Sequence, residues 1–193
     1  LNLCNKNLEN INKYDNTKAK HDLLAEVCYA AKYEGESINT HYTPHKEKYK
    51  DTGSGSTICT VLARSFADIG DIVRGRDLYL GGNKKEKNRR DQLEQKLIEI
   101  FGNIYNNLVR EKPQAQKRYN DPKENFFQLR EDWWTENRHT VWKAITCSKE
   151  LNNSSYFRAT CGGEKNPSLT PNKCRCDGDQ VPTYFDYVPQ YLR

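Results

Sequence analysis

Apolar residues recur at helical spacing in several long segments of this chain, and this pattern constrains the fold most strongly. Residues three and four apart share one face of an α-helix, so such a series predicts a helix with one buried side. The clearest series forms a broad apolar stripe between residues 58 and 74: Ile58, Val61, Leu62, Phe66, Ile69, Ile72 and Val73. No strand-like alternation stands out beside it. We therefore expect a mostly α-helical fold.

Further helices are predicted over residues 17–38 and 86–108, and from Asp121-Pro122, which suits a helix start, to residue 147. A short helix near residues 3–13 and the beginning of another at 184–193 are also expected. We predict loops at 39–57, 109–122 and 148–179. The last of these is rich in Asn, Ser, Gly, Pro and Cys, so we expect disulfides to tie it.

Three side chains within these helices invite a functional interpretation. Asp68 and Asp71 lie three residues apart, with Arg74 three further on. No nucleophile, histidine or metal partner accompanies the two carboxylates, so we expect structural ion pairs rather than catalysis.

Trp133 and Trp142 are expected in the core, whereas Trp134 suits either the core or a contact surface.

Composition places the chain among folded domains with a polar surface. Its 193 residues suffice for one domain with a sizeable core, and 11% aromatic residues argue against disorder despite a mean hydropathy of -1.01. The net charge of +5 permits contact with polyanions. Nucleic-acid binders usually concentrate their basic charge more than this, so no nucleic-acid partner is expected.

The absence of Met indicates a piece of a longer protein. No apolar run approaches the roughly 20 residues that span a bilayer. We expect any membrane anchor or export signal to lie outside these residues.

The seven cysteines favour disulfides over a metal site. Cys174 and Cys176 are too close for the usual zinc pair, and Pro44 breaks the helical spacing of His41 and His45. The odd count suggests that one cysteine has its partner elsewhere. Spacing alone leaves the connectivity open. The glycine-containing loop at residues 53–55 lacks the pattern of a phosphate-binding loop, so no cofactor is expected.

The densest basic cluster lies at residues 84–90 and holds five bases and one acid. These bases could bind sulfate or carboxylate groups of a glycosaminoglycan, while the simpler alternative is a solvated helix face. The candidate glycan-binding residues are Lys84, Lys85, Lys87, Arg89 and Arg90. Two weaker clusters are Lys46, Lys48 and Lys50, and Arg110, Lys112, Lys117 and Arg118.

Three sequence blocks together carry a family resemblance. They are Ala63-Arg-Ser-Phe-Ala-Asp-Ile-Gly-Asp-Ile-Val-Arg-Gly75, then Gln128-Leu-Arg-Glu-Asp-Trp-Trp134 with 140–147, and the closing segment 182–193. In this order the chain resembles the alpha-class Duffy-binding-like domain of the erythrocyte membrane protein 1 family of the malaria parasite Plasmodium falciparum. The resemblance implies a disulfide-stapled helical bundle of the Duffy-binding-like type with long irregular loops. It also implies one incomplete domain: residues 1–15 ending an N-terminal subdomain, 16–180 a central helical subdomain, and 181–193 the start of a C-terminal one.

The resemblance also implies a disulfide pattern. It pairs Cys59 with Cys176 and Cys28 with Cys147, which leaves Cys161 with Cys174 across a short loop. Cys4 would then pair with the absent N-terminal subdomain.

The function implied by the resemblance is adhesion to host cells, not catalysis. Such a domain would belong to the extracellular part of a variable surface protein on infected erythrocytes. It would take part in rosetting by binding heparan-sulfate-like glycans, blood-group sugars or a protein receptor, and antibodies would meet its variable loops. The alternative is a structural and antigenic spacer that binds no ligand and presents a neighbouring receptor-binding domain.

Overall fold

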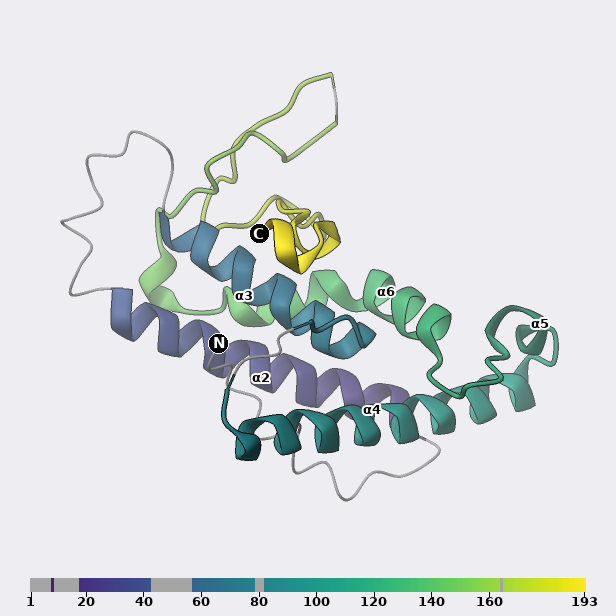
Figure 1. The fold of residues 1–193 in the computed structure, drawn as a ribbon. Helices are drawn as coiled ribbons and strands as arrows, with labels where there is room; N and C mark the ends of the chain where they lie inside the picture. Colours follow the sequence, from purple (N-terminus) through teal and green to yellow (C-terminus); the bar gives the residue numbers. More distant parts are fainter. Residues whose placement is uncertain (1–7, 9–17, 43–56, 79–81, 164) are drawn as a thin grey trace.

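Three helices form the centre of the molecule, and a fourth, longer helix lies along one side of them. The computed structural model describes residue 8 and residues 18–42, 57–78, 82–163 and 165–193. Helices α2 (Ala19–Tyr42), α3 (Thr57–Arg74) and α6 (Phe127–Ile145) pack on one another, and α4 (Lys84–Glu111) contacts α2 and α6 (Figure 1). Within the described ranges the only β-type pairing is two isolated bridges. The mostly helical fold predicted from the sequence is confirmed.

Aromatic side chains fill the centre of this arrangement. Phe66 of α3 lies with its ring centroid 5.1 Å from that of Trp134 and 5.2 Å from that of Trp142, both on α6. Trp133 and Trp142 belong to the core as predicted, and Trp134 is fully buried there too. Trp134 fits closely because residue 70 is Gly: a Cβ at that position would lie 2.8 Å from the indole ring.

The predicted helix start at Asp121 and Pro122 is wrong, because α6 begins at Phe127. The Asp121 carboxylate accepts hydrogen bonds from the backbone of Lys123, Asn125 and Phe126, which stabilises a turn instead. Glu124 and Phe126 have left-handed backbones, with φ of 56° and 54°, which no α-helix accommodates. A short helix, α5 (Ala115–Tyr119), interrupts the segment expected to be a loop.

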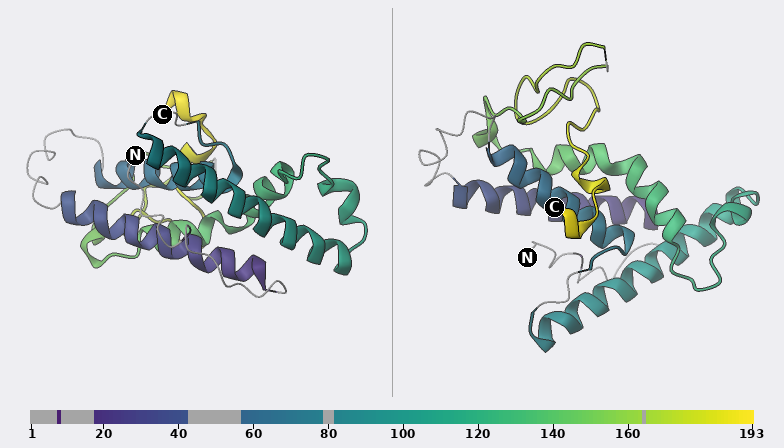
Figure 2. Two further views of the ribbon diagram at one scale, coloured as in Figure 1. Left: turned by 60° about the horizontal axis from the view of Figure 1, so that its bottom comes forward. Right: turned by 45° about the horizontal axis from the view of Figure 1, so that its top comes forward.

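The C-terminal segment forms two 3-10 turns, η3 (Phe185–Tyr187) and η4 (Gln190–Leu192), in place of the expected α-helix. Pro189 separates them and cannot donate the backbone hydrogen bond that a continuous helix needs. Both views in Figure 2 show this segment, in yellow, lying on α3. A third 3-10 turn, η2 (Lys149–Leu151), follows α6. Of the predicted helix at 3–13, only Leu8 lies within the described residues, and it is buried.

Buried charges hold the C-terminal segment in place. The Asp186 carboxylate accepts a hydrogen bond from Trp134 Nε1 at 2.9 Å and two from Arg138 at 2.8 Å. The buried Asp71 forms an ion pair with Arg74 at 2.9 Å and another with Arg193. The structural role expected for Asp71 is therefore confirmed, and the sequence analysis missed its second partner.

Candidate functional site

The candidate site begins with the cap of helix α4. The Asn83 side chain accepts a hydrogen bond from the backbone N–H of Glu86 at 3.0 Å, and the Glu86 carboxylate accepts one from the backbone N–H of Asn83 at 3.2 Å. This reciprocal pair is a capping box, which satisfies two of the N–H groups that a helix start leaves free. It fixes where α4 starts and thus the direction of the basic side chains that follow.

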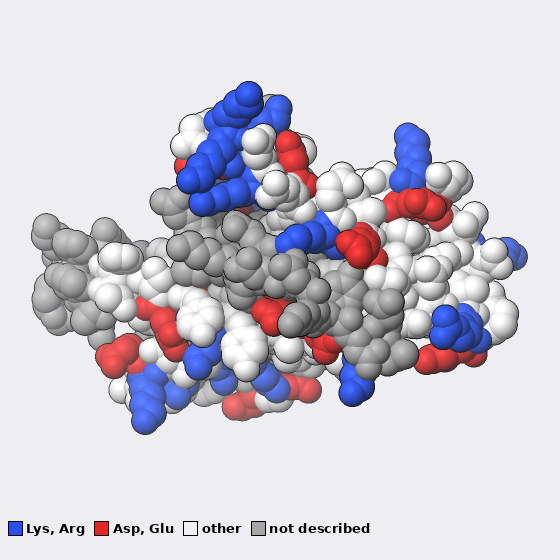
Figure 3. All heavy atoms as spheres, turned by 90° about the horizontal axis from the view of Figure 1, so that it is seen from below, with Lys and Arg blue, Asp and Glu red and all other residues white. Residues whose placement is uncertain are grey.

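The five candidate basic residues lie in the first two turns of α4. Lys84, Lys85, Lys87 and Arg89 are exposed, and Arg90 is half-buried. None of the four exposed residues forms an ion pair with a residue that the structure describes. Figure 3 shows Lys and Arg side chains gathered at this end of the helix.

Helix stability does not account for bases at this position. The N-terminal end of a helix carries a partial positive charge, so each cation there destabilises the helix by about 0.3–1 kcal/mol. Basic residues would be favoured at the other end. The cluster therefore has an unfavourable local electrostatic energy, which a bound anion would relieve.

The basic cluster at the far end of α4 does not join this one. Arg110 lies 20 residues beyond Arg90, the last base of the cluster, which at 1.5 Å per residue is about 30 Å along α4. Near that end, Arg118 donates two hydrogen bonds to Asp132, at 2.8 and 2.6 Å, so its charge is already compensated. Lys46, Lys48 and Lys50 lie outside the described residues. Among the described residues, the candidate site is therefore the start of α4.

Two disulfides tie the long C-terminal loop, but their partners differ from the predicted ones. The structure joins Cys59 to Cys174 and Cys161 to Cys176, whereas the resemblance suggested Cys59 with Cys176 and Cys161 with Cys174. The carbonyl of Cys174 accepts a hydrogen bond from Trp142 Nε1 at 3.0 Å, and its N–H donates to the carbonyl of Ser154 at 2.9 Å. These contacts hold Cys174 in the core against α3, and spacing alone does not distinguish two cysteines that are separated by a single residue.

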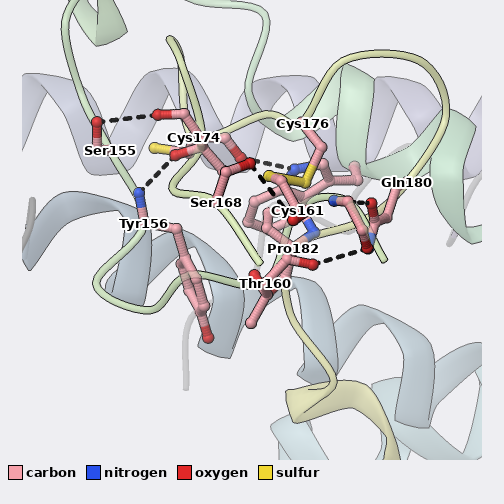
Figure 4. The surroundings of a disulfide bond; sticks show 12 residues. Ser155, Tyr156, Thr160, Cys161, Ser168, Cys174, Cys176, Gln180 and Pro182 are labelled. Atoms are coloured by element: carbon pink, nitrogen blue, oxygen red, sulfur yellow. Dashed lines mark hydrogen bonds between the residues drawn. A yellow bond between two sulfur atoms is a disulfide. The ribbon is translucent and has the colours of Figure 1, made fainter. Parts of the chain in front are cut away.

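The second disulfide closes the loop on itself. Cys161 forms two backbone hydrogen bonds with Ser168, and the Gln180 side chain donates to the carbonyl of Thr160 at 2.7 Å (Figure 4). Cys176 reaches Cys161 within this network, with a Cα–Cα distance of 5.3 Å. The loop is therefore tied both to α3 and to itself.

The predicted bridge between Cys28 and Cys147 is absent, since both are free thiols in the structure. Gly35 of α2 contacts the carbonyl of Ile145 at the end of α6. Cys28 lies seven residues before Gly35, or about 10 Å along the helix axis. A disulfide requires Cα atoms within about 7 Å, so this register separates the two thiols. Cys4 lies outside the described residues.

The described residues contain no group of His, Cys, Asp and Glu arranged to hold a metal ion. Asp68, the second carboxylate of the apparent acid pair, lies 3.4 Å from Arg193. Burial raises its pKa, and Arg193 opposes this effect. None of the described helices is both long and apolar enough to cross a membrane.

Comparison with known proteins gives a consistent result. The model of the Duffy binding domain family matches residues 1–193. A search of curated proteins found no match.

Several solved structures are similar over most of the chain. One is the N-terminal NTS-DBL1-alpha and CIDR-gamma double domain of PfEMP1 from the Plasmodium falciparum varO strain, with 43% identity over 96% of this chain and a TM-score of 0.74. The ICAM-1-binding DBLbeta domain of PfEMP1 IT4var13 is 32% identical over 96% of the chain, with a TM-score of 0.64. This chain covers 24% of the first structure and 38% of the second.

Proposed function

Because the chain belongs to the Duffy binding domain family, we propose that it is a host-cell adhesion module that binds sulfated glycans through the start of α4. The family consists of adhesion domains and not of enzymes. We place the module in the extracellular part of a PfEMP1-type protein on the surface of infected erythrocytes. Two disulfides suit such an oxidising location.

Relatives support the adhesive role in general terms. The structure of the IT4var13 DBLbeta domain has been determined in complex with ICAM-1, and that domain is 30% identical to this chain. We therefore propose that this chain also has a host receptor, whose identity can differ from that of the DBLbeta domain. Blood-group sugars and protein receptors on erythrocytes are further candidates within the same proposal.

The observation that carries the glycan proposal is the set of exposed bases without ion pairs at the start of α4. Some exposed bases elsewhere, such as Lys32 and Lys143, pair with carboxylates, and those that do not, such as Lys20, are spread over different elements instead of forming a dense cluster. Unpaired cations attract a polyanion without first breaking an internal ion pair. A sulfated glycan offers closely spaced sulfates to which Lys and Arg bind.

A heparin-binding measurement tests the proposal. The test variant replaces all five candidate bases with Gln, and retention on immobilised heparin is followed as the salt concentration rises. The matched control removes five exposed bases elsewhere, by Gln substitution at Lys20, Lys112, Lys117, Lys123 and Lys149.

We expect the wild-type protein and the control to elute at similar salt concentrations, and the test variant to elute earlier. Equal weakening of both variants would mean that net charge alone determines retention, which contradicts the proposed site. Absence of heparin and erythrocyte binding by the wild-type protein would instead favour a structural and antigenic spacer.

A further inference from the structure

The five bases at the start of α4 do not share one face of the helix. Successive residues of an α-helix point about 100° apart, so Lys84 and Lys85 point in different directions. Lys85 and Arg89 are four residues apart and share a face, whereas Lys84 and Lys87 share another. One extended ligand therefore cannot contact all five side chains equally.

The face of Lys85 and Arg89 continues as a polar track along the helix. Gln92 and Lys96 follow at seven and eleven residues after Lys85, so the track is about 16 Å long. Lys85, Arg89 and Gln92 are exposed, and Lys96 is half-buried and also takes part in a contact within the protein. These four positions contain three bases and one amide, with no acid among them.

The face of Lys84 and Lys87 has a different continuation. Asp91 lies four residues after Lys87, and Glu94 lies seven residues after it. The Glu94 carboxylate is already bound by Arg130 at 2.6 Å and 2.9 Å. A polyanion that followed this face would meet carboxylates within two turns, and like charges repel at this spacing.

Glu86 lies three residues before Arg89, close enough on a helix to pair with it, but it is engaged in another interaction. Its carboxylate accepts the Asn83 backbone N–H at 3.2 Å and lies 3.4 Å from the Asn83 amide nitrogen. Because the capping box holds this carboxylate, Arg89 remains available to a ligand. The guanidinium of Arg can bind two sulfate oxygens at once.

The side chains exposed on α4 indicate which kind of polyanion it can bind. None of its residues is among the large hydrophobic side chains exposed on the described surface. A protein partner would bury an apolar, often aromatic, centre, and single-stranded nucleic acid would stack its bases on aromatic rings. The track provides neither, so the fitting ligand is polar and charged along its whole length.

We propose that a linear sulfated polysaccharide lies along α4, contacting Lys85, Arg89, Gln92 and Lys96, with Lys84 and Lys87 outside the contact. This inference depends on the proposed glycan-binding function and adds the direction of the ligand and the residues that contact it. The two faces of α4 then contribute unequally to the affinity for the polysaccharide, although their bases are adjacent in sequence.

Two double variants of equal charge test the track. One is Lys85→Gln with Arg89→Gln, and the other is Lys84→Gln with Lys87→Gln. Binding to heparin fragments is measured at several salt concentrations, and circular dichroism checks the helix content of both variants. Each cation that neutralises a linear polyanion contributes close to one unit to the slope of log affinity against log salt.

We expect the first variant to lose about tenfold or more in affinity and its slope to fall by about two units. The second variant should change affinity less than about threefold, which corresponds to under 1 kcal/mol. Equal losses in both variants, or a larger loss in the second, would overturn the proposed direction. Failure of the wild-type protein to bind heparin would refute the glycan-binding function itself.

Two substitutions that each add one negative charge to α4 provide an independent test of the track. Gln92→Glu places a carboxylate on the track, whereas Gln95→Glu places one beside Asp91 on the other face. Both positions are exposed, so folding should tolerate both changes. We expect Gln92→Glu to weaken heparin binding more than Gln95→Glu, and the reverse order would contradict the track.

Discussion

Gly35 occupies the point where α2 presses on the end of α6. A Cβ added there would lie 2.1 Å from the carbonyl oxygen of Ile145, far inside the contact distance. The added Cβ is attached to the backbone of α2 and the carbonyl belongs to the backbone of α6, so neither can rotate away. Gly35→Ala should therefore destabilise the fold by about 1–3 kcal/mol, as overpacking does elsewhere.

Thermal or urea unfolding of Gly35→Ala measures this effect. Gly163→Ala is the control, because a Cβ at that position meets nothing within 4 Å. The control should unfold within about 0.5 kcal/mol of the wild-type protein. If Gly35→Ala changed the free energy of unfolding as little as the control does, the close packing of α2 on α6 at this position would be contradicted.

The two free thiols differ in their surroundings, and their reactivity should differ accordingly. Burial raises the pKa of Cys28 to about 11, while Cys147 is exposed. Only the thiolate is nucleophilic, so at pH 8 about one Cys28 side chain in a thousand is reactive. We expect iodoacetamide to modify Cys147 quickly and Cys28 slowly in the folded protein.

Peptide mapping without reduction, after alkylation at pH 8, checks this expectation. The denatured protein provides the reference, since both thiols should then react alike. A disulfide between Cys28 and Cys147 would contradict the free thiols of the structure and restore the bridge that the sequence resemblance implied.

At the scale of single elements, the two disulfides close loops of very different length. Cys59 and Cys174 are 115 residues apart, and Cys161 and Cys176 are 15 apart. In the chain-entropy model the shorter loop contributes about 3 kcal/mol, and the longer loop contributes about 2 kcal/mol more. Replacing both cysteines of the longer loop with Ala should therefore cost more stability than replacing both of the shorter loop.

Urea unfolding of the two double variants measures this difference. The comparison is reasonably matched, because all four cysteines are buried. A larger loss from the Cys161 and Cys176 variant would show that local order of the loop outweighs chain entropy.

Asp186 anchors the C-terminal segment to α6 through three hydrogen bonds from Trp134 and Arg138. Asp186→Ala would leave the Arg138 charge and the buried indole N–H without this acceptor. Removing one partner of a buried ion pair costs about 3–5 kcal/mol. We expect that loss, together with faster hydrogen exchange in residues 183–193.

Asp179→Ala serves as the control for this prediction. Asp179 is exposed and pairs with Lys143, and exposed ion pairs contribute little to stability. Unchanged exchange in residues 183–193 of the Asp186 variant would mean that Asp186 does not anchor the segment.

The helices could be predicted from sequence to the extent that local patterns determine them. The apolar stripe from residue 58 to 74 corresponds closely to α3, because its period is set by the buried face itself. The start of α6 was missed because the Asp121 turn depends on left-handed residues that helix-start patterns do not reveal. The exchanged disulfide partners depend on tertiary hydrogen bonds to Cys174, which spacing does not encode.

At the scale of the whole molecule, the charged side chains have two different roles. The buried carboxylates and arginines between α3, α6 and the C-terminal segment hold elements together, as Arg138 of α6 does with Asp186 of the C-terminal segment. The exposed bases at the start of α4 have no such structural partner among the described residues. Sequence composition counts both kinds alike, so a net charge of +5 did not by itself indicate where a ligand would bind.

The position of the basic cluster could be read from the sequence, and its isolation could not. The structure places the end of the cluster about 30 Å from Arg110 along α4, which only the continuous helix establishes. The division of the bases between two faces likewise follows once the start of α4 is fixed by its capping box.

Binding of the protein to erythrocytes, with soluble heparin as competitor, tests the central claim most directly. The account predicts that the wild-type protein binds, that heparin displaces it, and that the variant with Gln in place of the five α4 bases binds much more weakly. Undiminished binding of that variant to erythrocytes would contradict the claim that this domain adheres through the start of α4.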